Sequence, residues 1–144
     1  MNKVILLGRL TKDPEIRYSQ STEPVCISRF TVAVDRKFKK EGEQASDFIN
    51  CVAFRKTAEF MEKHIKKGML ITVEGSLSVR SYDDNEGNRR WITEVNVNEV
   101  GFAESRAAYE ARMAKANNAS ETQRAPEGFT EIDTDFDEKD DLPF

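Results

Sequence analysis

Aromatic side chains recur beside basic ones along this chain. The clearest cases are Phe38 with Arg36 and Lys37, Phe54 with Arg55 and Lys56, and Tyr82 with Arg80; Trp91, beside Arg89 and Arg90, is a more doubtful case. Flat aromatic rings stack on the faces of unpaired nucleobases, and cationic side chains attract the phosphates that link those bases. This combination of residue types is typical of a surface that binds single-stranded nucleic acid.

The pattern supplies two groups of candidate binding residues. The candidate stacking residues are Phe38, Phe48, Phe54, Tyr82 and Trp91. The candidate phosphate-binding residues are Lys3, Arg36, Lys37, Arg55, Lys56, Arg80 and Arg90. Any one of these aromatics could be an ordinary packing residue, but the shared company of Arg and Lys favours binding. Trp91 stays open, because its alternation matches that of Val95 and Val97, so it could cap the core as readily as stack.

The sequence contains no recognisable catalytic motif. There is no Gly-rich phosphate loop of the Walker type and no nucleophile elbow. Cys26, Cys51 and the lone His64 are too few for a zinc site, which needs four suitably spaced ligands. We therefore expect no enzyme activity, no metal and no cofactor, and we expect both cysteines to be reduced core residues. A metal-dependent nuclease is conceivable but nothing motivates it.

Alternating apolar residues predict the elements that position these side chains. Strands are expected over residues 3–10 with a continuation at 15–18 after a bend, 25–34, 47–54, 69–82 and 89–100. A helix is expected from about Thr57 to Lys67, capped by Gly68. In 47–54 the alternation places Phe48 and Phe54 on the face opposite the small apolar residues, and Gly75 marks a bend.

This order of elements predicts a mainly β fold. It is a five-stranded Greek-key barrel with one short helix between the third and fourth strands, the succession of an oligonucleotide-binding (OB) fold. In such a barrel the second and third strands, with their flanking loops, form the ligand face. The first strand is apolar on both faces, so one face could contact a partner subunit.

Charge divides the chain into parts. Residues 1–105 hold 17 Lys and Arg against 16 Asp and Glu, whereas residues 106–144 hold 5 against 10. We expect a binding domain at 1–103, a flexible Ala-rich and polar linker at 104–128, and a disordered acidic tail at 129–144. The tail ends in a tip suited to docking, in which two acidic residues precede three apolar ones: Asp140, Asp141, Leu142, Pro143 and Phe144. We expect no signal peptide and no membrane span, and hence a cytoplasmic protein.

Several segments closely resemble bacterial and bacteriophage single-stranded DNA-binding proteins. They are residues 1–15, 47–54, 66–68 and 93–95, together with the tip at 140–144. The resemblance implies that Phe38, Phe48, Phe54 and Tyr82 occupy base-stacking positions. It also implies a homotetramer that coats and protects single-stranded DNA in replication, recombination and repair, and that recruits partner proteins through the tip. Its setting would be the nucleoid, or the host cytoplasm if the protein is viral.

An alternative is left open by the near-neutral barrel domain. The chain could be an interaction adaptor, similar to primosomal proteins, whose OB fold binds little nucleic acid and whose tip does the work. Deletion of the tip separates the two functions, because only the adaptor would lose its main activity with it.

Overall fold

The computed structural model describes residues 1–123, and the chain divides into two compact units, of which the first is Met1–Ser105. The first unit contains six strands and one helix: β1 (Val4–Leu10), β2 (Glu15–Tyr18), β3 (Cys26–Asp35), β4 (Ser46–Phe54), α1 (Arg55–His64), β5 (Leu70–Asp83) and β6 (Arg89–Phe102). The second unit begins with α2 (Arg106–Gln123). The predicted acidic tail, 129–144, and its tip lie outside the described residues.

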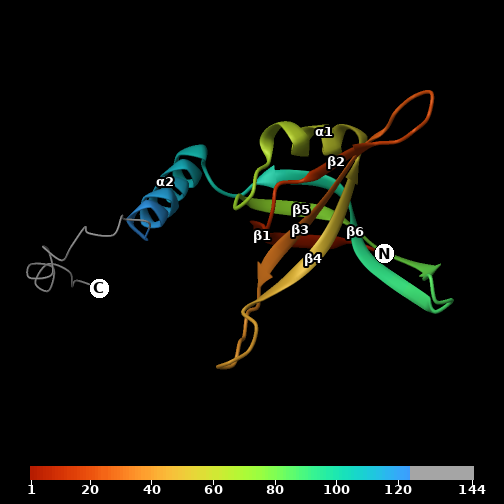
Figure 1. Cartoon of the computed structure of the whole chain (residues 1–144), viewed down its shortest axis with the longest axis horizontal. Helices are drawn as coiled ribbons and strands as arrows, with labels where there is room; N and C mark the ends of the chain where they lie inside the picture. Colours follow the sequence, from red (N-terminus) through yellow and green to blue (C-terminus); the bar gives the residue numbers. More distant parts are fainter. Residues whose placement is uncertain (124–144) are drawn as a thin grey trace, which may run out of the picture. The chain divides into compact units, whose positions relative to one another are not determined.

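The strands of the first unit form a closed barrel (Figure 1). Their order is β1-β5-β6-β4-β3-β2, and a further pairing of β1 with β3 closes the ring. β1 and β2 pair with β3 one after the other, at Leu10 opposite Val32 and then at Glu15 opposite Arg29. They therefore act as one bent strand, as expected from the break at 13–14, and the barrel has five strands. The predicted mainly β, OB-type fold is confirmed.

Two glycines allow neighbouring strands to approach closely, Gly8 where β1 meets β3 and Gly75 where β5 meets β6. A Cβ atom on Gly8 would lie 2.4 Å from the carbonyl oxygen of Ala33, and one on Gly75 would lie 2.1 Å from that of Asn96. The pairing of β5 with β6 shifts register between Glu74 and Gly75. Gly75 thus marks the irregularity that the sequence predicted, because any side chain there would collide with the neighbouring backbone.

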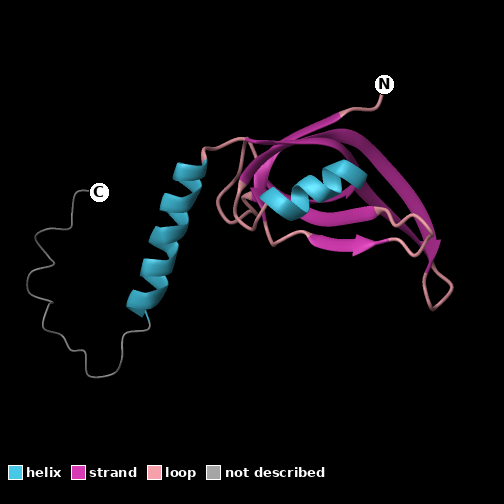
Figure 2. Cartoon of the chain, turned by 90° about the horizontal axis from the view of Figure 1, so that it is seen from above, coloured by secondary structure: helices cyan, strands magenta, loops and turns pink. Residues whose placement is uncertain are grey.

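Helix α1 lies over the barrel and packs against β3, β4 and β6 (Figure 2). It buries Ala58 and Met61. The predicted bounds were wrong at both ends: the helix begins at Arg55 and ends at His64, and its C-cap is Ile65 in an extended conformation. The Ile65 side chain is buried in the core, 2% exposed. Gly68, at φ 84°, does not cap the helix but serves the following turn, where its N–H donates to the carbonyl of Leu10.

The Ala-rich part of the predicted linker is helical: α2 covers Arg106–Gln123. Alanine and the long charged side chains of this stretch are strong helix formers. Within residues 1–123, no helix combines the length and apolar character needed to cross a membrane.

Candidate nucleic-acid interface

The outer face of the barrel carries most of the predicted stacking residues. In β4, Cys51 and Ala53 are buried in the core, whereas Phe48 and Phe54 point outward. Strands β5 and β6 form a hairpin, and the strand register shows which of its residues share the outer face of β4. Val52 pairs with Asn96 of β6, and Asn96 pairs with Ser76 of β5. Tyr82 lies six residues beyond Ser76 and so shares this outer face.

All of these rings are accessible. The exposed fractions are 84% for Phe38, 59% for Phe48, 40% for Phe54 and 46% for Tyr82. Phe38 belongs to the loop between β3 and β4, where the Lys37 ammonium lies 5.6 Å from its ring centroid. Exposed aromatic rings of this size normally indicate a contact surface, because leaving them in water is unfavourable.

Trp91 is exposed and does not pack in the core. Its side chain is 67% exposed, and it lies opposite Ser81 in the hairpin. It therefore shares a face with Leu77 and Val79, which are also exposed, on the side of the hairpin opposite Tyr82. Of the two interpretations that the sequence left open, core packing is wrong, and stacking stays a prediction.

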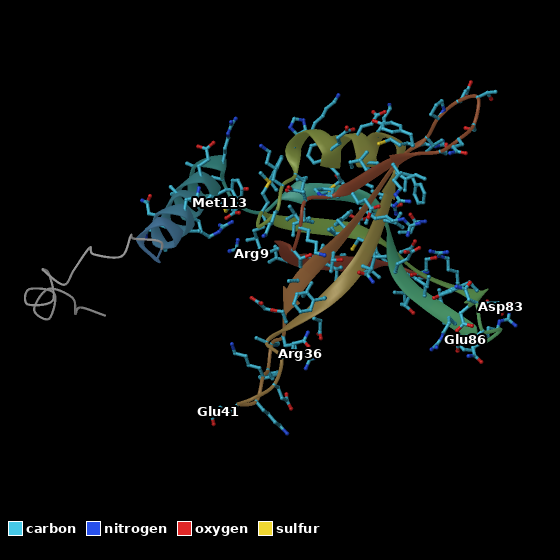
Figure 3. All side chains as sticks on the ribbon, viewed as in Figure 1. Arg9, Arg36, Glu41, Asp83, Glu86 and Met113 are labelled. Atoms are coloured by element: carbon cyan, nitrogen blue, oxygen red, sulfur yellow. The ribbon has the colours of Figure 1, made fainter. Side chains whose placement is uncertain are left out.

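Two arms extend from the barrel and carry many of the predicted phosphate ligands. Figure 3 shows Arg36 and Glu41 on the β3–β4 arm, and Asp83 and Glu86 at the end of the β5–β6 arm. Arg36 binds Asp47 at the base of its arm, with its Nε and Nη2 atoms 2.9 and 2.7 Å from Oδ1. On the other arm, Arg90 Nε lies 3.2 Å from Asp84 Oδ2.

The remaining predicted ligands differ in their surroundings. Lys3 pairs with Glu74 of β5 at 2.9 Å, and this contact raises the pKa of Lys3. Arg55 and Lys56 are exposed and have no ion pair with another described residue. Arg55 also has a left-handed backbone, with φ at 57°. These side chains come from separate parts of the barrel surface rather than from one compact cluster.

A hollow of about 430 Å³ opens on the outer face beside β3, β4 and the hairpin. Its lining includes Arg29, Thr31, Asn50, Arg80, Ile92 and Glu94. Thr31 Oγ1 donates to Asn50 Oδ1 at 3.0 Å, which orients that amide. The carboxylate of Glu94 lies between two arginines, 3.4 Å from Arg80 Nε and 3.9 Å from Arg29 Nη1.

Arg29 and Glu94 are functional candidates that the sequence reasoning missed. The signal for Arg29 was its position in β3, where Cys26, Ser28 and Phe30 face inward and the odd positions face outward.

Beneath the hollow, burial and then the Glu94 charge raise the pKa of the Cys51 thiol to about 12. Both cysteines are buried free thiols, as expected. Among residues 1–123, no group of His, Cys, Asp or Glu could hold a metal ion.

Comparison with known proteins assigns the chain to a family. Residues 1–103 match the model of the single-strand binding protein family. A single-stranded DNA-binding protein of Caldanaerobacter subterraneus subsp. tengcongensis is 41% identical over 151 residues, covering 100% of this chain and 99% of the relative. Single-stranded DNA-binding protein 2 of Clostridium acetobutylicum is 51% identical over 104 residues, covering 72% and 77%. Single-stranded DNA-binding protein 3 of Listeria innocua is 46% identical over 123 residues, covering 85% and 76%.

The family match covers nearly the whole barrel unit and therefore the outer face and both arms. The similarity to the Caldanaerobacter protein extends over the remainder as well. This chain belongs to the single-strand binding protein family.

Proposed function

We propose that this protein binds single-stranded DNA without sequence selection, on the outer face of the barrel. The observation that carries the proposal is the exposure of Phe48, Phe54 and Tyr82 on one continuous face that also bears Arg29 and Arg80. Each base stacked on such a ring is worth about 1–3 kcal/mol, and any base offers a flat face for it. Family membership and the names of the relatives support the same function.

Binding would be driven by stacking together with local phosphate contacts. The barrel unit is close to neutral, with 17 Lys and Arg against 16 Asp and Glu in residues 1–105. Long-range attraction is therefore weak, and the phosphates must be met by individually placed cations such as Arg55, Lys56 and Arg80. A duplex hides its base faces, so it loses the stacking term and should bind more weakly.

The decisive experiment is a titration of the full chain with a labelled single strand and with the matched duplex, followed by fluorescence anisotropy. We expect a strong preference for the single strand and an affinity that falls as salt rises, because phosphate contacts release counterions. Equal affinity for both forms would overturn the proposal. Absence of binding to either form would favour the interaction adaptor.

The wider role follows from this activity. The protein would coat and protect single strands exposed in replication, recombination and repair, as a homotetramer. Ile5 and Leu7 of β1 support association, because both apolar side chains point outward into solvent in the isolated chain. Light scattering coupled to gel filtration measures the mass directly, and a monomer at micromolar concentration would contradict the oligomer.

Recruitment of replication and repair proteins would use the tip, residues 140–144, which lie outside the described residues. Its mixture of acidic and apolar groups supports this role. Deleting the five residues should abolish partner binding while single-strand binding is kept or strengthened, because an acidic segment competes with phosphates for basic side chains. Loss of DNA binding on this deletion would contradict the division of labour.

A further inference from the structure

A carboxylate sits at the floor of the proposed phosphate-binding face. The Glu94 side chain is 12% exposed, whereas those of Arg29 and Arg80 are 52% and 48% exposed. Both arginines therefore keep part of their guanidinium in solvent while another part faces Glu94. An acidic group at this place needs an explanation, because its charge opposes the binding of a polyanion.

The strand register explains how one carboxylate reaches both arginines. Arg80 lies opposite Ile92 in the hairpin, so it is a diagonal neighbour of Glu94 on the same face. Arg29 reaches from β3, where it lies opposite Val52, and Val52 in turn pairs with Asn96. Val52 is small and buried, at 4% exposed, although it belongs to the outer face. The arginine can therefore extend over β4 toward the carboxylate.

We propose that Glu94 is a positioning residue that fixes Arg29 and Arg80 for the DNA backbone. A free arginine loses rotamer freedom when it binds a phosphate, but one already held by a carboxylate has lost part of it beforehand. Arginine has five N–H donors. Arg80 donates to Glu94 from Nε at 3.4 Å and keeps its other donors for a phosphate, whereas Arg29 is held only by an ion pair at 3.9 Å. This inference rests on the proposed single-strand binding.

Substitution of Glu94 by glutamine separates positioning from simple charge. If charge alone mattered, Glu94→Gln would remove one negative charge from the face and tighten binding. If Glu94 positions the arginines, the same variant binds a single strand about 10-fold more weakly, a decrease at the lower end of that expected for one charge-assisted hydrogen bond. The logarithmic salt slope also becomes shallower, by about 0.7 for each phosphate that the variant no longer neutralises.

Glu99→Gln is the matched control. Glu99 lies on the same strand, is exposed, and has no ion pair with an arginine among the described residues. It makes the same change in charge, so it should bind as tightly as the unmodified chain or slightly more tightly. Glu94→Asp keeps the charge on a shorter side chain and should recover part of the affinity.

A double-mutant cycle ties the effect to the arginines. In a chain that already carries Arg29→Ala and Arg80→Ala, Glu94→Gln should no longer weaken binding. Melting curves for every variant show whether the barrel is folded at the assay temperature. If Glu94→Gln does not fold, Arg29→Ala and Arg80→Ala are compared singly and together: decreases in affinity that add simply contradict a shared carboxylate, and coupled decreases support it.

The inference and the proposed function fail in different ways. If the unmodified chain prefers single strands but Glu94→Gln binds as tightly as Glu99→Gln, the positioning role is overturned and the function stands. If the unmodified chain shows no preference for single strands, the function itself is wrong, and the inference falls with it.

Discussion

Arg55 is the residue where backbone geometry and proposed function meet most directly. It follows Phe54 of β4 and opens α1 with a φ of 57°, a conformation that costs a side-chain-bearing residue about 1–2 kcal/mol. Every other described residue with positive φ is a glycine: Gly42, Gly68 and Gly87. An exposed arginine kept in this conformation indicates a role for its side chain.

Replacing Arg55 with glycine should therefore separate stability from binding. We expect Arg55→Gly to raise the free energy of unfolding by roughly 0.5–1 kcal/mol, since relief of strain exceeds the added entropy of the unfolded chain. Single-strand affinity should fall if Arg55 binds a phosphate as proposed, because that cation is removed. Urea denaturation and anisotropy titration measure the two effects.

The neighbouring basic residue provides the control. Lys56→Gly removes the same charge from the second position of α1, where glycine is a poor helix former and costs up to about 1 kcal/mol. It should therefore lower both stability and affinity. If Arg55→Gly also lowers stability, the strain argument is wrong.

Phe54 carries the second prediction at this scale. Phe54→Ala should weaken single-strand binding by about 1–3 kcal/mol without unfolding the barrel, because its ring points outward at a proposed stacking position rather than into the core. Phe102→Ala is the control: Phe102 is also exposed, but its ring contacts Phe60 at 5.6 Å between centroids. That variant should change stability rather than affinity, and equal affinities for the two variants would remove Phe54 from the site.

The alternation of side chains along a strand predicted which of these residues face outward. Alternation correctly separated Phe48 and Phe54 from the buried Cys51 and Ala53, because the period of a strand is fixed. Parity does not tell where the barrel ends. Trp91 has the parity of core residues, yet it is exposed because it lies on the part of the β5–β6 hairpin that extends beyond the core. Alternation shows that Arg29 faces outward, but its contact with Glu94 joins strands that are distant in sequence.

At the scale of elements, the order could be predicted but the start of α1 could not. The sequence predicted that the helix begins at about Thr57, a residue type that often caps helices. Its hydroxyl instead donates to the carbonyl of Asn98 at 3.2 Å, and the N-cap is Phe54, which makes no side-chain cap. The helix starts two residues earlier, at Arg55, and Thr57 contacts a strand more than 40 residues away, which local sequence cannot reveal.

The β5–β6 arm is held at its tip by one carboxylate. Asp84 Oδ1 accepts the backbone N–H groups of Asn88 at 2.8 Å and of Glu86 at 3.0 Å, and Oδ2 accepts from Arg90. These contacts, that of the Asn88 N–H first, lower the pKa of the Asp84 carboxyl below its ordinary value. The turn is thus built around an ionised group.

Acid should loosen this tip before the barrel responds. A depressed pKa in the folded state means that the contribution is complete above the unfolded value, about 3.9, and disappears as pH falls through the lower folded value. We expect the amide resonances of Glu86 and Asn88 to move together below pH 4 in an NMR titration. An Asp84 carboxyl that titrates at or above the ordinary value would contradict the arrangement.

At the scale of the whole molecule, binding and stability must be linked. The barrel that presents the stacking face also encloses Cys26 and Cys51, one on β3 and one on β4, as buried free thiols. Burial comes first among the causes that raise the pKa of both thiols, to about 12 for Cys51. At pH 8 the folded protein therefore holds almost none of Cys51 as thiolate, which is the form that reacts, and less Cys26 thiolate than an ordinary thiol would give.

Thiol labelling should accordingly report the opening of the barrel, and DNA should slow it. In the unfolded chain the thiol pKa returns to about 8.5, so a thiol reagent at pH 8 labels mainly molecules that have opened. A ligand that binds only the folded state suppresses opening by the factor 1 + [L]/Kd, so a single strand at 100 times its Kd should slow labelling about 100-fold. The matched duplex at the same concentration should slow it far less. A labelling rate that single strands leave unchanged would mean that the thiols are reached by local motions of β3 or β4 that DNA binding does not restrain.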